Sequence, residues 1–181
     1  MSILKVDTIN EKTSGNGVHI AGHVVQTLSD TSTVTESTNT RASSNTFANS
    51  SLSITITPKS ASSKIVVNAV VSTGAASGAD ASVILRLVRD STPIGIGDAS
   101  GNRIRAGSGR GTENQGNNSI LNIPLQAIDT PNTTSAITYT VQFAIRGTGV
   151  TTSYLNRSGS DGDTAEHQRT SSSLVIQEIA Q

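Results

Sequence analysis

The feature that most constrains this sequence is a series of short segments in which apolar and polar residues alternate. A period of two places apolar residues on one face of a β-strand, whereas an amphipathic helix needs a period of about 3.6. Gly, Pro, Asn and Ser separate the segments and are typical of turns between strands. The sequence therefore predicts an all-β fold. The expected strands are residues 3–9, 18–20, 23–28, 52–56, 64–71, 81–88, 94–96, 120–128, 137–145, 150–155 and 174–179.

These strands fall into an opening segment and a larger body. Residues 1–28 hold the first short strands around a polar turn, and we expect them to form a separate N-terminal β-hairpin. Residues 29–50 are polar and rich in Ser and Thr, which predicts a linker or an edge strand of the next domain. Residues 51–181 contain the regular strands. Their number, with turns and no helices between them, predicts a β-sandwich, jelly roll or barrel.

The core of such a body has few large side chains to draw on. The chain has no Trp, whereas Ser and Thr supply 27 and 24 of its 181 residues. A single copy with so little apolar volume is expected to be only marginally stable, and burial against further copies would stabilise it. The composition therefore predicts a homo-oligomer. The aromatic residues are Phe47, Tyr139, Phe143 and Tyr154.

Charge and cysteine content exclude several classes of function. The formal net charge is zero and no basic stripe is present, so nucleic-acid binding is not expected. The absence of cysteine excludes disulfides, thiolate metal sites and cysteine nucleophiles. No segment has the apolar run of a signal peptide or a membrane span, so we expect synthesis in the cytoplasm and no membrane insertion.

Three short segments resemble known phage proteins. The N-terminal sequence resembles a recurrent segment of tail-fibre and other virion structural proteins of marine and cyanobacterial phages. The residues that carry this resemblance are KVDTI at 5–9, EKTSG at 11–15 and GVHI at 17–20. In the body, ITPKSASSKI at 56–65 and SSSLVIQEI at 171–179 look like phage proteins with a jelly-roll head. Such heads are similar to the globular heads of complement and tumour-necrosis-factor-like trimers.

This resemblance implies a bacteriophage virion structural protein, a short tail-fibre or appendage subunit that forms a homotrimer. Its N-terminus would attach to other virion proteins of the tail or capsid. Its jelly-roll head would bind a host-surface target such as polysaccharide, or a neighbouring subunit. The family carries no catalytic residues and no cofactor, so none is expected here. A capsid decoration protein (a cement or head-fibre protein) is the alternative, and a polysaccharide-cleaving tail spike is a third hypothesis.

The opening segment carries a narrow row of apolar residues. Three copies of such a row around an axis can close on one another and remove exposed strand edges. Three equivalent heads would also bind with greater avidity than one head. The predicted attachment and trimer seam consists of Ile3, Val6, Ile9, Val18 and Ile20.

A long loop rich in Gly, Arg and Asn spans residues 98–118. It lacks the Walker-type motif and the strand-to-helix setting of a phosphate-binding loop. Because long ordered loops often carry function, contact with host polysaccharide or a neighbouring virion protein is one interpretation. A flexible tip or an inter-subunit arm is the other. The candidate binding residues are Arg103, Arg105, Arg110, Asn114 and Asn117.

No metal site is predicted. His19 and His23 are four residues apart, but they lie in strand-like sequence with no carboxylate neighbour to orient them, and His167 has no identifiable partner. The sequence from Asp161 to Asp163 resembles the start of an acidic cation loop, yet the later ligands of an EF-hand are missing, so a solvated turn is expected.

No enzyme activity is predicted either. The chain lacks the Gly-x-Ser-x-Gly motif of serine hydrolases. Two carboxylates could in principle act as a glycosidase pair, but a sugar-cleaving groove is usually lined by aromatic side chains, and this chain has four. The glutamates considered for such a pair are Glu36, Glu113, Glu166 and Glu178.

Overall fold

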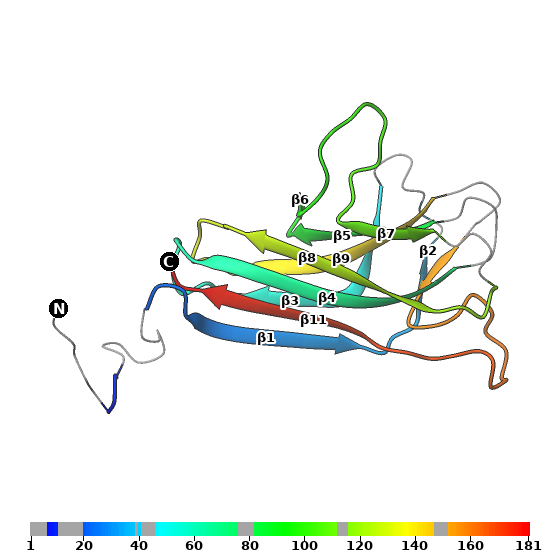
Figure 1. Ribbon diagram of the computed structural model, residues 1–181, viewed down its shortest axis with the longest axis horizontal. Helices are drawn as coiled ribbons and strands as arrows, with labels where there is room; N and C mark the ends of the chain where they lie inside the picture. Colours follow the sequence, from blue (N-terminus) through cyan, green and yellow to red (C-terminus); the bar gives the residue numbers. More distant parts are fainter. Residues whose placement is uncertain are drawn as a thin grey trace.

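Eleven β-strands account for the regular structure of the described residues, which are 7–10, 20–38, 40, 46–75, 82–111, 116–146 and 152–181 of a computed structural model. The strands form two antiparallel sheets packed against each other (Figure 1). These ranges contain no helix, and hence none that could cross a membrane. The all-β sandwich predicted from the alternating pattern is therefore confirmed.

The first sheet is built around β4 (Lys64–Ala75), its longest strand. One edge of β4 pairs with β11 (Ser172–Ile179) and, further along, with β10 (Ser153–Leu155). The other edge pairs with β8 (Leu121–Asp129). Two strands lie outside these: β1 (Val24–Ser32) pairs with β11, and β2 (Glu36–Thr38) pairs with β10.

The second sheet has the order β3 (Ala48–Ile56), β9 (Ile137–Arg146) and β5 (Ser82–Arg89). Two short strands share the remaining edge of β5. β6 (Thr92–Ile94) pairs with the end of β5, and β7 (Ser108–Gly111) pairs with its beginning. Between β6 and β7 the chain forms a long loop that projects from the body at the top of Figure 1.

The inward-facing residues of both sheets form the main hydrophobic core. Tyr139 and Phe143 of β9 are its largest fully buried side chains, and aliphatic residues fill the rest. Burial of one large aliphatic side chain stabilises the fold by about 1.5–3 kcal/mol. Alternation places these residues inward: along β3, Leu52, Ile54 and Ile56 are buried while the residues between them are exposed.

The entry to the sandwich and the C-terminus lie at the same end of the molecule. The backbone N–H of Gly22 donates to the carbonyl of Ala180 at 2.8 Å, and the N–H of Ala180 donates to the carbonyl of His23 at 2.9 Å. This end is on the left in Figure 1. β9 starts there with Ile137 and finishes with Arg146 at the opposite end. The sandwich therefore has a terminal end and a distal end.

A buried carboxylate holds the turn between β3 and β4 at the terminal end. Glu178 is fully buried. Its Oε1 accepts the backbone N–H of Lys59 at 2.8 Å and that of Ser60 at 3.3 Å, and its Oε2 accepts Nε2 of Gln26 at 2.6 Å. These donors compensate the cost of removing the carboxylate from water.

A second network joins the two sheets through Asp129, at the end of β8. Nη1 of Arg89 donates to both of its carboxylate oxygens, at 2.9 and 2.8 Å, and the hydroxyl of Tyr139 donates to Oδ2 at 2.8 Å. Burial raises the pKa of Tyr139, and the hydrogen bond to Asp129 raises it further. The hydroxyl therefore stays protonated and serves as a donor.

Most predicted strands coincide with observed ones to within a few residues. The predicted boundary at residue 28 falls inside β1, which pairs with β11 along its length. Residues 29–50 contain the end of β1, all of β2 and the start of β3. The predicted strands at 3–9 and 18–20 lie mostly outside the described residues, and residues 7–10 and 20 are not in strands.

One prediction about the loop at 98–118 was wrong, because β7 lies inside it. The sequence of β7, Ser-Gly-Arg-Gly, has no apolar alternation to indicate a strand. It forms because the edge of β5 offers unpaired backbone groups at residues 82–85.

Candidate functional site

The loop between β6 and β7 has a closed neck. The N–H of Gly97 donates to the carbonyl of Ala106 at 3.1 Å, and the N–H of Gly107 donates to the carbonyl of Leu85 at 3.0 Å. The neck packs closely against β8 of the other sheet. A Cβ on Gly107 would lie 2.6 Å from Cδ1 of Leu125, so a larger residue would require this buried side chain to shift. The loop is therefore anchored to both sheets at its base.

Hydrogen bonds within the loop fix its upper part. The N–H of Arg103 donates to the carbonyl of Ser100 at 3.1 Å, closing a turn in which Gly101 has a φ of 54°. Nη1 of Arg103 donates to Oγ of Ser100 at 2.7 Å. Nε of Arg105 donates to the carbonyl of Gly97 at 2.8 Å. Loops of this kind, with close ends and internal packing, present side chains in a defined arrangement.

A small apolar cluster ties the loop to the outer face of the second sheet. Ile104 of the loop and Ile84 of β5 pack against Phe47 and Ala144. The guanidinium of Arg86 lies 4.0 Å from the centre of the Phe47 ring, a cation–π contact. Burial lowers the pKa of Arg86 from its ordinary value. This cluster holds the loop against the sheet.

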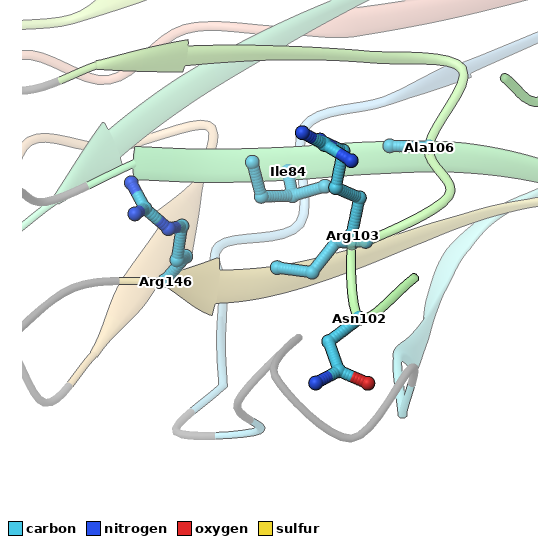
Figure 2. A pocket seen from close by; sticks show the side chains of 6 residues that line it. Ile84, Asn102, Arg103, Ala106 and Arg146 are labelled. Carbon is cyan, nitrogen blue, oxygen red and sulfur yellow. The ribbon is translucent and has the colours of Figure 1, made fainter. Parts of the chain in front are cut away.

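An open pocket with a volume of about 570 Å³ lies between the loop and the sheet (Figure 2). Arg103 comes from the loop and Arg146 from the end of β9, and Figure 2 shows them on either side of Ile84. The pocket is at the distal end of β9 and toward the beginning of β5. The lining residues are Ile84, Asn102, Arg103, Ile104, Ala106 and Arg146.

The chemistry of this pocket combines two positive charges with an apolar floor. The six lining residues in the described part of the chain include no carboxylate. Guanidinium groups bind carboxylate and phosphate oxygens through their planar set of N–H donors. Asn102 adds an amide, and Ile84, Ile104 and Ala106 supply apolar surface. The arrangement can therefore bind an anion that is attached to a larger, partly apolar group.

The structure separates the predicted binding residues. Arg103 lines the pocket, whereas Arg105 contacts the neck through the carbonyl of Gly97. Arg110 lies on β7, where burial lowers its pKa. The carbonyl of Asn117 accepts the N–H of Ser160, which places Asn117 beside another loop. Asn114 lies outside the described residues.

Sequence reasoning missed Arg146. It is the charged residue that ends an otherwise uncharged strand, and it lies more than 40 residues from Arg103 along the chain. The pairing of β9 with β5 brings it to the pocket, because Arg146 is opposite Ser82. A charged residue at the end of a buried strand is a weak signal on its own.

Two residues of the predicted seam can be placed. Ile9 is 58% exposed and Ile20 is 40% exposed, so both apolar side chains are open to solvent in a single copy. Ile3, Val6 and Val18 lie outside the described residues.

The acidic turn at residues 161–163 has a carboxylate that is paired with two arginine side chains. Asp161 forms ion pairs with Arg157 and Arg169, and the hydrogen bond from Arg169 is the main reason that its pKa is lowered. Two neighbouring guanidinium groups disfavour a metal cation there. Nδ1 of His167 lies 2.8 Å from the carbonyl of Gly162. Across the described ranges, no cluster of three His, Asp or Glu side chains suits a metal ion.

The described glutamates that were considered as a glycosidase pair each have a different partner. Glu36 accepts the N–H of Ser51 at 3.0 Å, Glu166 accepts an amide N–H of Asn118 at 3.3 Å, and Glu178 is buried at the terminal end. His19 and Glu113 lie outside the described residues.

No protein-family model and no curated protein matches this chain.

Proposed function

We propose that this chain is a structural subunit of a bacteriophage particle, a short tail-fibre or appendage protein that acts as a homotrimer in the virion. Its N-terminal segment attaches to the particle, and its sandwich is a non-enzymatic binding head. The observation that carries this proposal is that the N-terminal segment and the pocket lie at opposite ends of the sandwich. The chain enters β1 beside the C-terminus at one end, and the pocket with Arg146 lies toward the other. A head anchored through its N-terminal segment would present that pocket outward.

The strand order supports a jelly-roll head. If β1 and β2, β10 and β11, and β6 and β7 are each counted as one interrupted strand, both sheets have four positions. The first sheet then has the order β1/β2, β11/β10, β4, β8, and the second has the order β3, β9, β5, β6/β7. Eight antiparallel strands divided in this way between two sheets fit a jelly roll, a fold that occurs in viral capsid and lectin domains. The fold alone does not assign a function.

Exposed apolar residues support assembly into a homotrimer. On the outer face of the first sheet, Val70 is 46% exposed and Ile128 is 72% exposed. By alternation, β4, β8 and β11 place one charged side chain on this face, Lys64 at its margin. Exposed apolar residues on a face with so little charge favour contact with another protein surface. Ile9 and Ile20 add further apolar surface.

Removal of residues 1–19 tests attachment, because it leaves β1 and its pairing with β11 complete. The shortened chain should fold and should no longer join phage particles. A variant with Arg103 and Arg146 both replaced by Gln is the matched control and should still be incorporated. Incorporation of the shortened chain would refute attachment through the N-terminal segment.

Sedimentation of the full chain tests the trimer. It should give three times the mass of one copy, and a stable monomer would refute the trimer.

A capsid decoration protein is the second candidate function. The outer face of the first sheet favours it, because a face with one charged side chain and exposed apolar residues also suits contact with shell subunits. Imaging of particles distinguishes the two functions. Density at the tail supports the appendage, whereas density over the junctions between capsomers supports decoration.

A further inference from the structure

We infer that the pocket between Arg103 and Arg146 binds an acidic saccharide, in which a carboxylate or phosphate carried on a sugar contacts the two guanidinium groups. The inference rests on the proposed function as a binding head, and it specifies the class of ligand. It also adds Arg146, Asn102 and the apolar floor at Ile84 to the binding site.

The charge of the pocket supports an anionic ligand. In the described part of the chain, the three ion pairs engage Arg89, Arg157 and Arg169. None engages Arg103 or Arg146, and the described residues that line the pocket with them include no carboxylate. Two guanidinium groups on the same open pocket, with no acid among its described lining residues, favour an oxyanion.

The pocket is largely organised before a ligand arrives. The bond from Nη1 of Arg103 to Oγ of Ser100, at 2.7 Å, restricts that side chain. The neck at Gly97 and Ala106 closes the loop, and the packing of Ile104 on the sheet holds it in place. Binding therefore orders few additional groups, which reduces the entropic cost of association.

The size and lining of the pocket favour a saccharide over a free ion or a nucleic acid. A volume of about 570 Å³ lies in the range of small-molecule sites and exceeds what a single ion needs. Ile84, Ile104 and Ala106 offer apolar surface to the C–H face of a sugar ring. The described residues that line the pocket include no aromatic side chain, so they provide no stacking platform of the kind that single-stranded nucleic acids use. Its open form allows a polymer chain to continue beyond it.

Binding of defined polymers to the full-length protein tests this inference. The probes are a polyuronate, which carries carboxylates, a phosphate-bearing polysaccharide, neutral dextran and single-stranded DNA, all titrated at the same ionic strength. We expect binding to at least one acidic polysaccharide, which then identifies carboxylate or phosphate as the source of the anion, and no binding to dextran. Equal binding of dextran, or binding of DNA as tight as that of the saccharide, would overturn the assignment.

Variants localise the binding to the pocket. Arg103→Gln and Arg146→Gln should each weaken binding about tenfold, the value expected for one charge-assisted hydrogen bond. Ala106→Glu should abolish binding by placing a negative charge in the pocket. Lys64→Gln removes one positive charge from the other sheet and should leave the affinity unchanged. Thermal melting of each variant confirms folding.

Two results would distinguish failure of this inference from failure of the proposed function. If the folded arginine variants bind like the wild type, the pocket assignment is refuted while the proposed role in the particle stands. If the wild-type chain binds acidic saccharide through Arg103 and Arg146 but never joins particles, the proposed role is refuted and the pocket assignment stands.

Discussion

Substitution of Gly74 by Ala should destabilise the sandwich through one close backbone approach. Gly74 lies near the end of β4, opposite Tyr154 of β10. A Cβ at this position would lie 2.3 Å from the carbonyl oxygen of Arg157 and 3.1 Å from Cα of Ser158. Real Cβ atoms essentially never approach other atoms below 3.0 Å. Because both neighbours are backbone atoms, no side-chain rotation can relieve the contact.

The expected loss follows from two opposing effects. The φ of Gly74 is outside the left-handed region, so Ala fits the local conformation, and the reduced entropy of the unfolded chain would by itself stabilise the fold by about 0.4–1 kcal/mol. Overpacking costs about 1–3 kcal/mol, and the upper value applies because backbone must move. We therefore expect a net loss of about 2 kcal/mol, which lowers the melting temperature by about 4–8 °C for a chain of this length.

Gly97→Ala is the matched control. It places the same methyl group where no heavy atom lies within 4 Å, again outside the left-handed region. It should leave the melting temperature unchanged or raise it slightly, because only the entropic effect operates. Circular dichroism melts and denaturant titrations of the full-length variants at one protein concentration measure both effects. A Gly74→Ala protein as stable as the wild type would refute the steric argument.

Three further changes test the buried networks and the acidic turn. Tyr139→Phe removes a hydrogen bond to a carboxylate and should lower the unfolding free energy by about 1.5 kcal/mol in a denaturant titration; equal stability would refute this. Glu178→Ala removes the acceptor for the backbone at 59–60, so those amide hydrogens should exchange faster, and unchanged protection would contradict that role. Because Arg169 lowers the pKa of Asp161, this carboxylate stabilises the fold above its unfolded pKa of about 3.9 and loses that effect as the pH falls through its lower folded value. Melting temperatures from about pH 6 to about pH 2 should therefore fall more for the wild type than for Asp161→Asn, and parallel curves would contradict this.

The strands could be predicted because each has one face in the core. Leu52, Ile54 and Ile56 are buried at alternate positions of β3, and the same pattern recurs along β8 and β9. β7 could not be predicted in this way. Its residues contribute no apolar row, and it exists because the edge of β5 has backbone groups to satisfy.

The candidate site was predicted in part. Its arginine-rich loop could be recognised from composition, and Arg103 does line the pocket. Arg105 and Arg110 belong to the same stretch, yet one contacts the neck and the other lies on a strand. The sequence does not show which of these arginines lines the pocket, because their positions depend on the path of the loop over the sheet.

The sequence by itself determined that the chain folds as strands, which residues face inward, and which loop carries positive charge, because these follow from local spacing and composition. Only the tertiary structure decided that Arg146 joins Arg103 and that the pocket lies away from the terminal end. The physical reason is that strand order and register are set by long-range pairing. β5 pairs with β9 although more than 40 residues separate them, and the residue pattern of neither strand predicts this pairing.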